Sequence, residues 1–286
     1  MPVPTFADGT PMKFRRLLPL AAVAAAAVVL GAGAAAPASA ASTPLGYAGA
    51  AQHTGLSPSV AGPLVNATSR NWAGYAITSL SSPTATFTHV HGSWTQRAIT
   101  CPAPDAWAIF WVGFDGWTNG TVEQGGSSAR CVNSTPVYQL WWEMFPTNAI
   151  QPVLTINAGD SVSADVTYNA ATAQYTITVA DATQHTSFTT TQTCAANLVC
   201  SRSSADWIVE AVGRFGTGNF FPLANYGQAL MNNSVATDNA GHSGSMTSNS
   251  TWQRTRIQEQ DATTTYATTG NTSTNGQNFA VTWAHQ

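Results

Sequence analysis

The sequence predicts an all-β fold, a single sandwich or barrel of short strands. The chain carries short runs rich in Val, Thr, Tyr, Phe and Trp, and turn residues separate these runs about every 8–12 residues. No stretch shows a sustained helical period with start and stop signals. No internal repeat recurs at a fixed period, which argues against a propeller.

The N-terminus has the pattern of a secretory signal over residues 1–40. Lys13, Arg15 and Arg16 precede the apolar run LLPLAAVAAAAVVLGAGAAA, and the small-residue segment APASA follows it. A membrane anchor is the alternative, but no later segment approaches about 20 apolar residues. We therefore expect a secreted, extracellular protein that begins near Ala41 and has no membrane attachment once the signal is removed.

The rest of the chain divides into two parts. Residues 41–68 are rich in Ala, Gly, Ser and Pro without a period, as in a linker or a short propeptide. Residues 69–286 form the predicted β-sandwich domain, in which segments 117–136 and 214–250 are expected to be loops. The predicted strands lie, in order, within 71–79, 85–96, 106–117, 136–146, 152–182, 185–193, 205–213, 255–260 and 278–284.

The charge of the chain argues against a nucleic-acid partner and indicates tolerance of acid. From Ala41 onward, seven arginines face twelve Asp and Glu residues, a formal balance of 7 − 12 = −5. Such a chain has no basic footprint for nucleic acid. Only 8% of the residues are charged, against about 25% in average domains. Protonating the carboxylates would leave little self-repulsion, so we expect tolerance of acid.

Four cysteines in an exported chain indicate two disulfides. Three pairings are possible, and sequence neighbours give the simplest one, Cys101 with Cys131 and Cys194 with Cys200. Their spacing does not suit a metal site, and the six histidines form no HExxH or comparable set. No metal or other cofactor is predicted.

Two residues are candidates for catalysis. Glu210 follows the apolar segment WIV on a predicted strand, and partial burial there would raise its pKa and suit it to acid or base work. Gln124 precedes a glycine pair, where backbone can approach a ligand, and its amide could donate to an oxyanion. An edge-strand glutamate in solvent and a surface glutamine are the ordinary alternatives. No GxSxG elbow and no DTG or DSG motif occurs.

Several motifs in order resemble those of the glutamic peptidases, the eqolisin or peptidase G1 family. The resemblance covers roughly residues 70–240. The motifs are NWAGY (71–75), WVGFDG (111–116), EQGG (123–126), WWEMFP (141–146), INAGDSVSADV (156–166) and SADWIVEA (204–211).

This resemblance implies a sandwich of two curved antiparallel sheets, of the concanavalin A-like or jelly-roll-like kind. It places the catalytic pair on Gln124 and Glu210, with Glu210 activating water and Gln124 stabilising the oxyanion. The implied activity is that of an acid endopeptidase insensitive to the usual aspartic-protease inhibitor. It would cleave polypeptides without a cofactor, and a monomer is the default for such a hydrolase.

The resemblance also singles out six supporting positions. Trp72, Trp111 and Trp142 are expected to be cleft aromatics, although aromatic strand residues often pack in a core. Asp115 and Glu143 are expected to contact the catalytic pair or the substrate backbone. Phe145 is a departure, because the family often has a tyrosine there whose hydroxyl would contact the glutamine.

A carbohydrate-active or carbohydrate-binding sandwich is the alternative function. A glycosidase could use Glu143 and Glu210 as its carboxylate pair, and a binding module could use surface tryptophans. Ten tryptophans in an exported all-β chain fit both possibilities.

Overall fold

The computed structural model describes residues 64–81, 84–214 and 217–285, which hold sixteen strands and no helix. These residues belong to one compact unit, Ser42–Gln286. The strands are β1 (Leu64–Ser69), β2 (Trp72–Ser79), β3 (Phe87–Thr95), β4 (Trp107–Asp115), β5 (Val122–Val132), β6 (Thr135–Phe145), β7 (Asn148–Thr155), β8 (Ser161–Asn169), β9 (Gln174–Asp181), β10 (Thr186–Thr193), β11 (Ser204–Glu210), β12 (Gln228–Asp238), β13 (Ser243–Ser245), β14 (Trp252–Gln260), β15 (Thr265–Thr269) and β16 (Phe279–Trp283).

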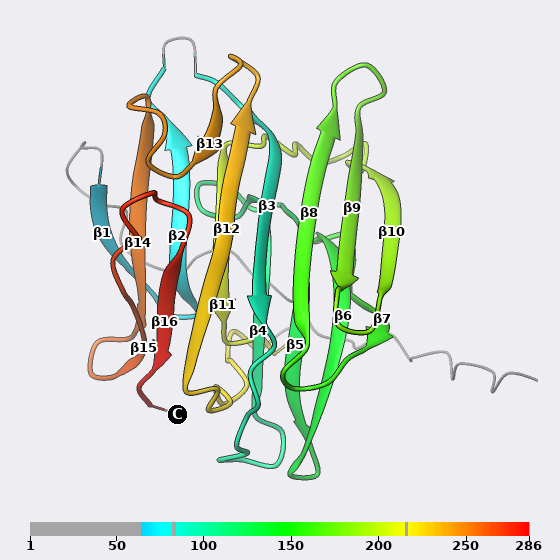
Figure 1. Cartoon of the computed structure of the whole chain (residues 1–286), viewed down its shortest axis with the longest axis vertical. Coiled ribbons are helices and arrows are strands. Elements are labelled where there is room, and N and C mark those ends of the chain that lie inside the picture. Colours follow the sequence, from blue (N-terminus) through cyan, green and yellow to red (C-terminus); the bar gives the residue numbers. More distant parts are fainter. Residues whose placement is uncertain (1–63, 82–83, 215–216, 286) are drawn as a thin grey trace, which may run out of the picture. The chain divides into compact units, whose positions relative to one another are not determined.

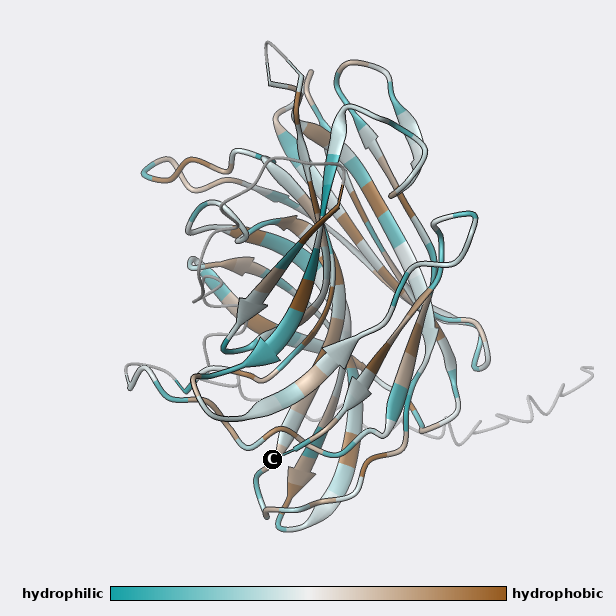
Figure 2. Ribbon diagram, turned by 90° about the vertical axis from the view of Figure 1, so that its left-hand side faces the viewer, coloured by the Kyte–Doolittle hydropathy of each residue, from teal (hydrophilic) through white to brown (hydrophobic). Residues whose placement is uncertain are grey.

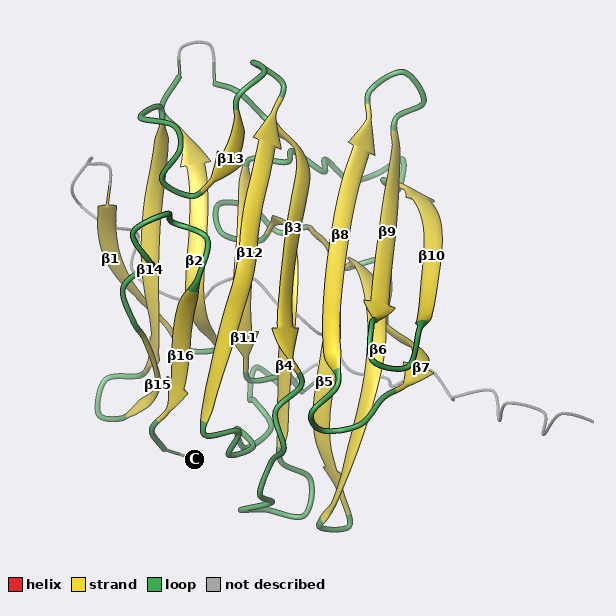
Figure 3. Cartoon of the chain, in the orientation of Figure 1, coloured by secondary structure: helices red, strands yellow, loops and turns green. Residues whose placement is uncertain are grey.

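The strands form two facing layers, as Figures 1 and 3 show. We call β10-β9-β8-β3-β12-β16 the front sheet and β14-β2-β11-β4-β5-β6-β7 the back sheet, and β15 joins the two. Neighbours within both sheets are antiparallel, whereas β1 pairs with β14 in parallel. The predicted all-β sandwich is therefore confirmed.

The main core lies between the two sheets. Alternate residues of each strand point into it, as in β8, where Val162, Ala164 and Val166 are buried and the residues between them are more exposed. Figure 2 shows the resulting change of hydropathy along the strands. Trp207 of β11 also crosses the core, since its Nε1 donates a hydrogen bond to the carbonyl of His91 on β3 at 2.8 Å. The alternation fixes which face each back-sheet residue occupies.

Two predicted loops contain long strands instead. Segment 117–136 includes β5, and segment 214–250 includes β12 and β13. In β5 the glycine pair is a packing requirement. A Cβ on Gly125 would lie 2.9 Å from Ile177 of the front sheet, and one on Gly126 would overlap the carbonyl oxygen of Phe110. Contact with the front sheet at Gly125 and with the neighbouring strand β4 at Gly126 thus explains glycines that resemble a turn in the sequence.

The boundary of the predicted linker also differs. Residues 64–68 belong to β1, which pairs with β14. Residues 41–63 and the predicted signal, 1–40, lie outside the described residues. Within the described ranges, no helix is long and apolar enough to cross a membrane.

Both predicted disulfides are present. Cys101–Cys131 ties the segment before β4 to the end of β5, and Cys194–Cys200 closes the connection between β10 and β11. The second disulfide therefore lies just before the strand that carries Glu210.

Candidate active site

Three rows of side chains cross the outer face of the back sheet, the face turned away from the front sheet. Strand register aligns each row. The first row is Thr255, Ala76, Asp206, Gly113, Gln124 and Glu143, and the second is Ile257, Gly74, Ile208, Trp111, Gly126 and Trp141. The third contains Trp72, Glu210, Ile109, Ser128 and Gln139, with Glu259 of β14 beyond Trp72 in the same alternation.

Glu210 ends β11 and is fully buried on this face. Its two carboxyl oxygens have separate donors: Asn71 Nδ2 lies 3.1 Å from Oε1, and Trp111 Nε1 lies 2.9 Å from Oε2. Burial raises the pKa of Glu210 well above its ordinary value, and the charge of Glu143 adds to this, while the Trp111 and Asn71 donors oppose it. The result is an oriented carboxyl group with high proton affinity.

Gln124 lies on β5 and is also fully buried. Its Nε2 donates a hydrogen bond to Oε2 of Glu143, its neighbour on β6, and its Oε1 has no partner among the described residues. The opposite position on β4 is Gly113, where a Cβ would lie only 2.7 Å from Cβ of Gln124. An amide nitrogen carries two N–H groups, so one remains available for a ligand.

The three acidic and amide side chains belong to one electrostatic unit. Glu143 bonds Gln124 and also repels the charged form of Glu210. Trp111 lies on β4 between the strands of Gln124 and Glu210, and Trp72 meets it edge-on at 5.0 Å between ring centroids. A carboxyl group and an amide donor thus flank an aromatic floor.

The predicted cleft aromatics divide between the two faces. Trp72 and Trp111 lie on the outer face and pack in its apolar cluster. The prediction for Trp142 is wrong, because this residue packs against the core between the sheets, whereas Trp141 takes the outer position. The signal was in the sequence: on a strand that turns Glu143 outward, Trp141 must share its face. Phe145 also packs against the outer cluster, two residues beyond Glu143.

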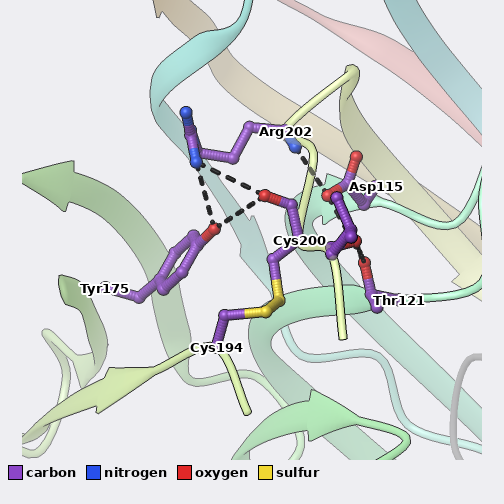
Figure 4. Close-up of a disulfide and its surroundings, with 7 residues drawn as sticks. Asp115, Thr121, Tyr175, Cys194, Cys200 and Arg202 are labelled. Carbon is purple, nitrogen blue, oxygen red and sulfur yellow. Dashed lines mark hydrogen bonds between the residues drawn. A yellow bond between two sulfur atoms is a disulfide. The ribbon is translucent and has the colours of Figure 1, made fainter. Parts of the chain in front are cut away.

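Asp115 holds the chain that leads into β11. Its carboxylate accepts hydrogen bonds from the backbone N–H of Arg202 at 2.6 Å, and from the backbone N–H and hydroxyl of Ser203 at 2.7 and 2.9 Å. Figure 4 shows this carboxylate beside the Cys194–Cys200 disulfide. Asp115 therefore supports the strand of Glu210, and its hydrogen bonds do not reach the catalytic pair, which is one of the two contacts predicted for it.

Further bonds fasten the same connection. Tyr175 of β9 donates its hydroxyl to the carbonyl of Cys200 at 3.3 Å, and the guanidinium of Arg202 reaches both groups at 3.4 Å (Figure 4). The guanidinium also stacks over Tyr168, 3.6 Å from the ring centroid. The segment before β11 is thus held to both sheets.

Sequence reasoning gave no role to three polar residues of this face. Asn71 bonds Glu210, and Asp206 and Glu259 are fully buried carboxyl groups on the outer face. Period-two alternation in the sequence already places Asp206 on the face of Glu210, and Glu259 is one of only four glutamates, but neither signal indicated a role. No group of three or more His, Cys, Asp and Glu residues in the described ranges could hold a metal ion.

Comparison with known proteins identifies the family. Residues 70–283 match the profile of the Peptidase A4 family. The chain belongs to this family. It is therefore a glutamic peptidase, as its motifs predict. No curated protein sequence matches the chain.

Solved structures of peptidases in this family share the fold. Scytalido-glutamic peptidase with a peptide-based transition-state analogue matches 75% of this chain and 98% of its own, with a TM-score of 0.63 and 19% identity. The structure of SCP-B, an eqolisin, in complex with the tripeptide Ala-Ile-His matches 75% of this chain and 98% of its own, with a TM-score of 0.61 and 18% identity. Aspergilloglutamic peptidase from Aspergillus niger matches 63% of this chain and 99% of its own, with a TM-score of 0.54 and 23% identity.

Proposed function

We propose that the protein is a secreted acid endopeptidase that hydrolyses peptide bonds with Gln124 and Glu210. The observation that carries this proposal is the pairing on one sheet face of a buried carboxyl of raised pKa with an amide donor. The family match to the glutamic peptidases supports the reaction class. The signal-like segment at residues 1–40 supports export.

Each group has one role in hydrolysis. As a carboxylate, Glu210 takes a proton from water, and the water oxygen attacks the scissile carbonyl carbon. The second N–H of Gln124 Nε2 donates to the oxyanion that forms. Glu210 then gives its proton to the leaving nitrogen as the C–N bond breaks. The raised pKa makes Glu210 an effective donor in this last step.

The hydrogen-bond donors around Glu210 hold its carboxyl group in a fixed orientation during the reaction. Asn71 and Trp111 hold one oxygen each, so the carboxylate cannot rotate away from the water it activates. Glu143 fixes the amide plane of Gln124 in the same way. Because Glu143 is bound to Gln124, it is not an independent partner carboxyl for Glu210, and the family match also favours peptidase over carbohydrate chemistry.

The test is hydrolysis of denatured haemoglobin or casein across pH 2 to 7 by the secreted protein and two variants. We expect an optimum in acid, activity that survives pepstatin, and a loss of roughly 100-fold or more in both Glu210→Gln and Gln124→Ala. Gln139→Ala, a glutamine on the same face, is the matched control and should keep its activity. Circular dichroism checks that each variant is folded. Full activity in a folded Glu210→Gln or Gln124→Ala would overturn the mechanism.

A further inference from the structure

A cavity of about 450 Å³ lies beyond the end of β11, next to the residue that follows Glu210, and its lining includes residues of both apolar clusters. Its walls include Ala211, which follows Glu210 in the chain, and Arg70. Arg70 precedes Asn71, whose side chain donates a hydrogen bond to Glu210. Glu259 lines it from the far side of Trp72. The volume falls in the range of small-ligand pockets, roughly 300–1,000 Å³.

The walls combine apolar and polar side chains, and the apolar ones are mostly contiguous in the chain. One part of the wall is the continuous segment Phe220, Phe221, Pro222 and Leu223. Tyr266, on the strand β15 that follows β14, also lines the cavity. Such a surface gains free energy by covering the body of a large side chain.

Glu259 is the fully buried polar residue among those that line this cavity. The residue is fully buried, and its Oε2 has no hydrogen-bond partner among the described residues. Burial raises the pKa of Glu259 well above its ordinary value, so in acid it is a neutral carboxylic acid that can both donate and accept. A ligand with a polar tip could hydrogen-bond this carboxyl group, whereas a purely apolar ligand would leave it without a partner.

The other two charged groups of the cavity, Arg70 and Asp261, are opposite in sign. Arg70 is exposed, with its guanidinium 5.5 Å from the ring centroid of Phe220. Asp261 accepts hydrogen bonds from the Tyr266 hydroxyl and from the backbone N–H groups of Thr263 and Thr264. Asp261 is thus engaged by its own turn, whereas Arg70 would repel a lysine or arginine side chain.

We propose that this cavity is a substrate subsite that selects an uncharged aromatic side chain with a hydroxyl tip, tyrosine above phenylalanine. The inference rests on the proposed peptidase function. The ring would lie against Phe220 and Phe221, and the hydroxyl would bond the carboxyl group of Glu259, which lines the cavity. A site that is built to bond a hydroxyl discriminates strongly against an analogue that lacks it.

The experiment compares cleavage of peptide pairs that differ only by Tyr or Phe at one position near the scissile bond, scanned over successive positions by mass spectrometry. For the unmodified protein in acid we expect one position at which kcat/KM for Tyr exceeds that for Phe by about 10-fold or more. Glu259→Leu should bring this ratio close to 1. Glu259→Gln, whose amide can still bond a hydroxyl, should keep part of it.

Glu123→Gln is the matched control. Glu123 is also a fully buried glutamate without a hydrogen-bond partner among the described residues, but it lies on the other face of β5, so its substitution should leave the Tyr/Phe ratio unchanged. A preference for Lys or Arg at every position, or a Tyr/Phe ratio unaffected by folded Glu259→Leu, would overturn the subsite. An inactive unmodified protein, or an active Glu210→Gln, would instead count against the catalytic proposal.

Discussion

Glu210 and Gln124 are diagonal to one another across β4. Glu210 is opposite Ile109, whereas Gln124 is opposite Gly113, four positions further along the same strand. The residue between these two positions on the same face is Trp111. The indole N–H of Trp111 donates a hydrogen bond to the carboxyl of Glu210.

Replacing Trp111 by Phe should move the acid limb of the pH profile. The change removes a donor that lowers the pKa of Glu210, so this pKa rises and the carboxylate form is lost at a higher pH. We expect kcat/KM in acid to fall roughly 10- to 100-fold. Trp141→Phe is the control, because its Nε1 on the same face has no partner among the described residues. Identical pH profiles for the two variants would contradict the role of the indole N–H.

Replacing Asp115 by Ala should destabilise the fold. The carboxylate accepts hydrogen bonds from two backbone N–H groups and from the hydroxyls of Ser203 and Thr121, and its removal leaves these donors without this acceptor. We expect a loss of about 2–4 kcal/mol in the free energy of unfolding, measured with urea. Asp105→Ala removes a half-exposed ion pair with Arg214 and should cost about 1 kcal/mol or less. Equal losses would show that Asp115 does not anchor the segment before β11.

Stability should be greatest in mild acid. Burial raises the pKa values of Glu123, Asp206, Glu210 and Glu259. The folded state keeps these protons to higher pH than the unfolded chain, so their contribution is complete below about pH 4 and is lost as the pH rises through the raised values.

Asp165 sets the opposite limit. Burial opposes its ionisation, but the hydrogen bonds with His89 and His91 outweigh burial and hold its pKa below the ordinary value. Its contribution is present above about pH 4 and is lost as the pH falls further.

Thermal unfolding from pH 3 to 8 checks this balance. We expect the melting temperature Tm to decrease as the pH rises from 4 to 7. The variant Glu123→Gln should have a Tm roughly 2–8 °C higher than the parent at pH 7, with little difference at pH 4. A flat profile, or a Glu123→Gln variant less stable than the parent at pH 7, would contradict this account.

The two disulfides should differ in their contributions. Cys101–Cys131 spans 30 residues and Cys194–Cys200 spans 6. In the chain-entropy model the double Ser variants should lose about 3–4 and about 2 kcal/mol, respectively. Urea unfolding of both variants measures the difference, and a larger loss from the shorter loop would mean that strain or lost packing dominates.

The sequence was sufficient for the fold class because alternation survives wherever one strand face is buried. Segments such as 161–181 alternate cleanly and form β8 and β9 as expected. β5 and β12 were missed for a physical reason: GGSS and NNS are turn-like in sequence. The contacts that require glycine in β5 arise only between strands, with Ile177 of β9 for Gly125 and with Phe110 of β4 for Gly126.

The site was predictable where local alternation decides the face and not where tertiary contacts do. Glu210 lies on the side of β11 that its spacing implied, together with Asp206 and Ile208. The bond from Asn71 to Glu210 joins residues 139 positions apart, and the cavity beside Glu259 is bounded by four separate segments. Such contacts have no signature in any single stretch of sequence.

The three rows of the outer face have a consequence for recognising distant members of this family. Within a strand, residues that serve the site are separated by even numbers of positions, as in Asp206, Ile208 and Glu210, or in Trp141, Glu143 and Phe145. Deleting one residue inside β11 would turn the glutamate into the apolar layer between the sheets. Gaps in an alignment of relatives should therefore fall in the connections between strands. The even spacing between site residues within each strand should persist even where the residue types have diverged.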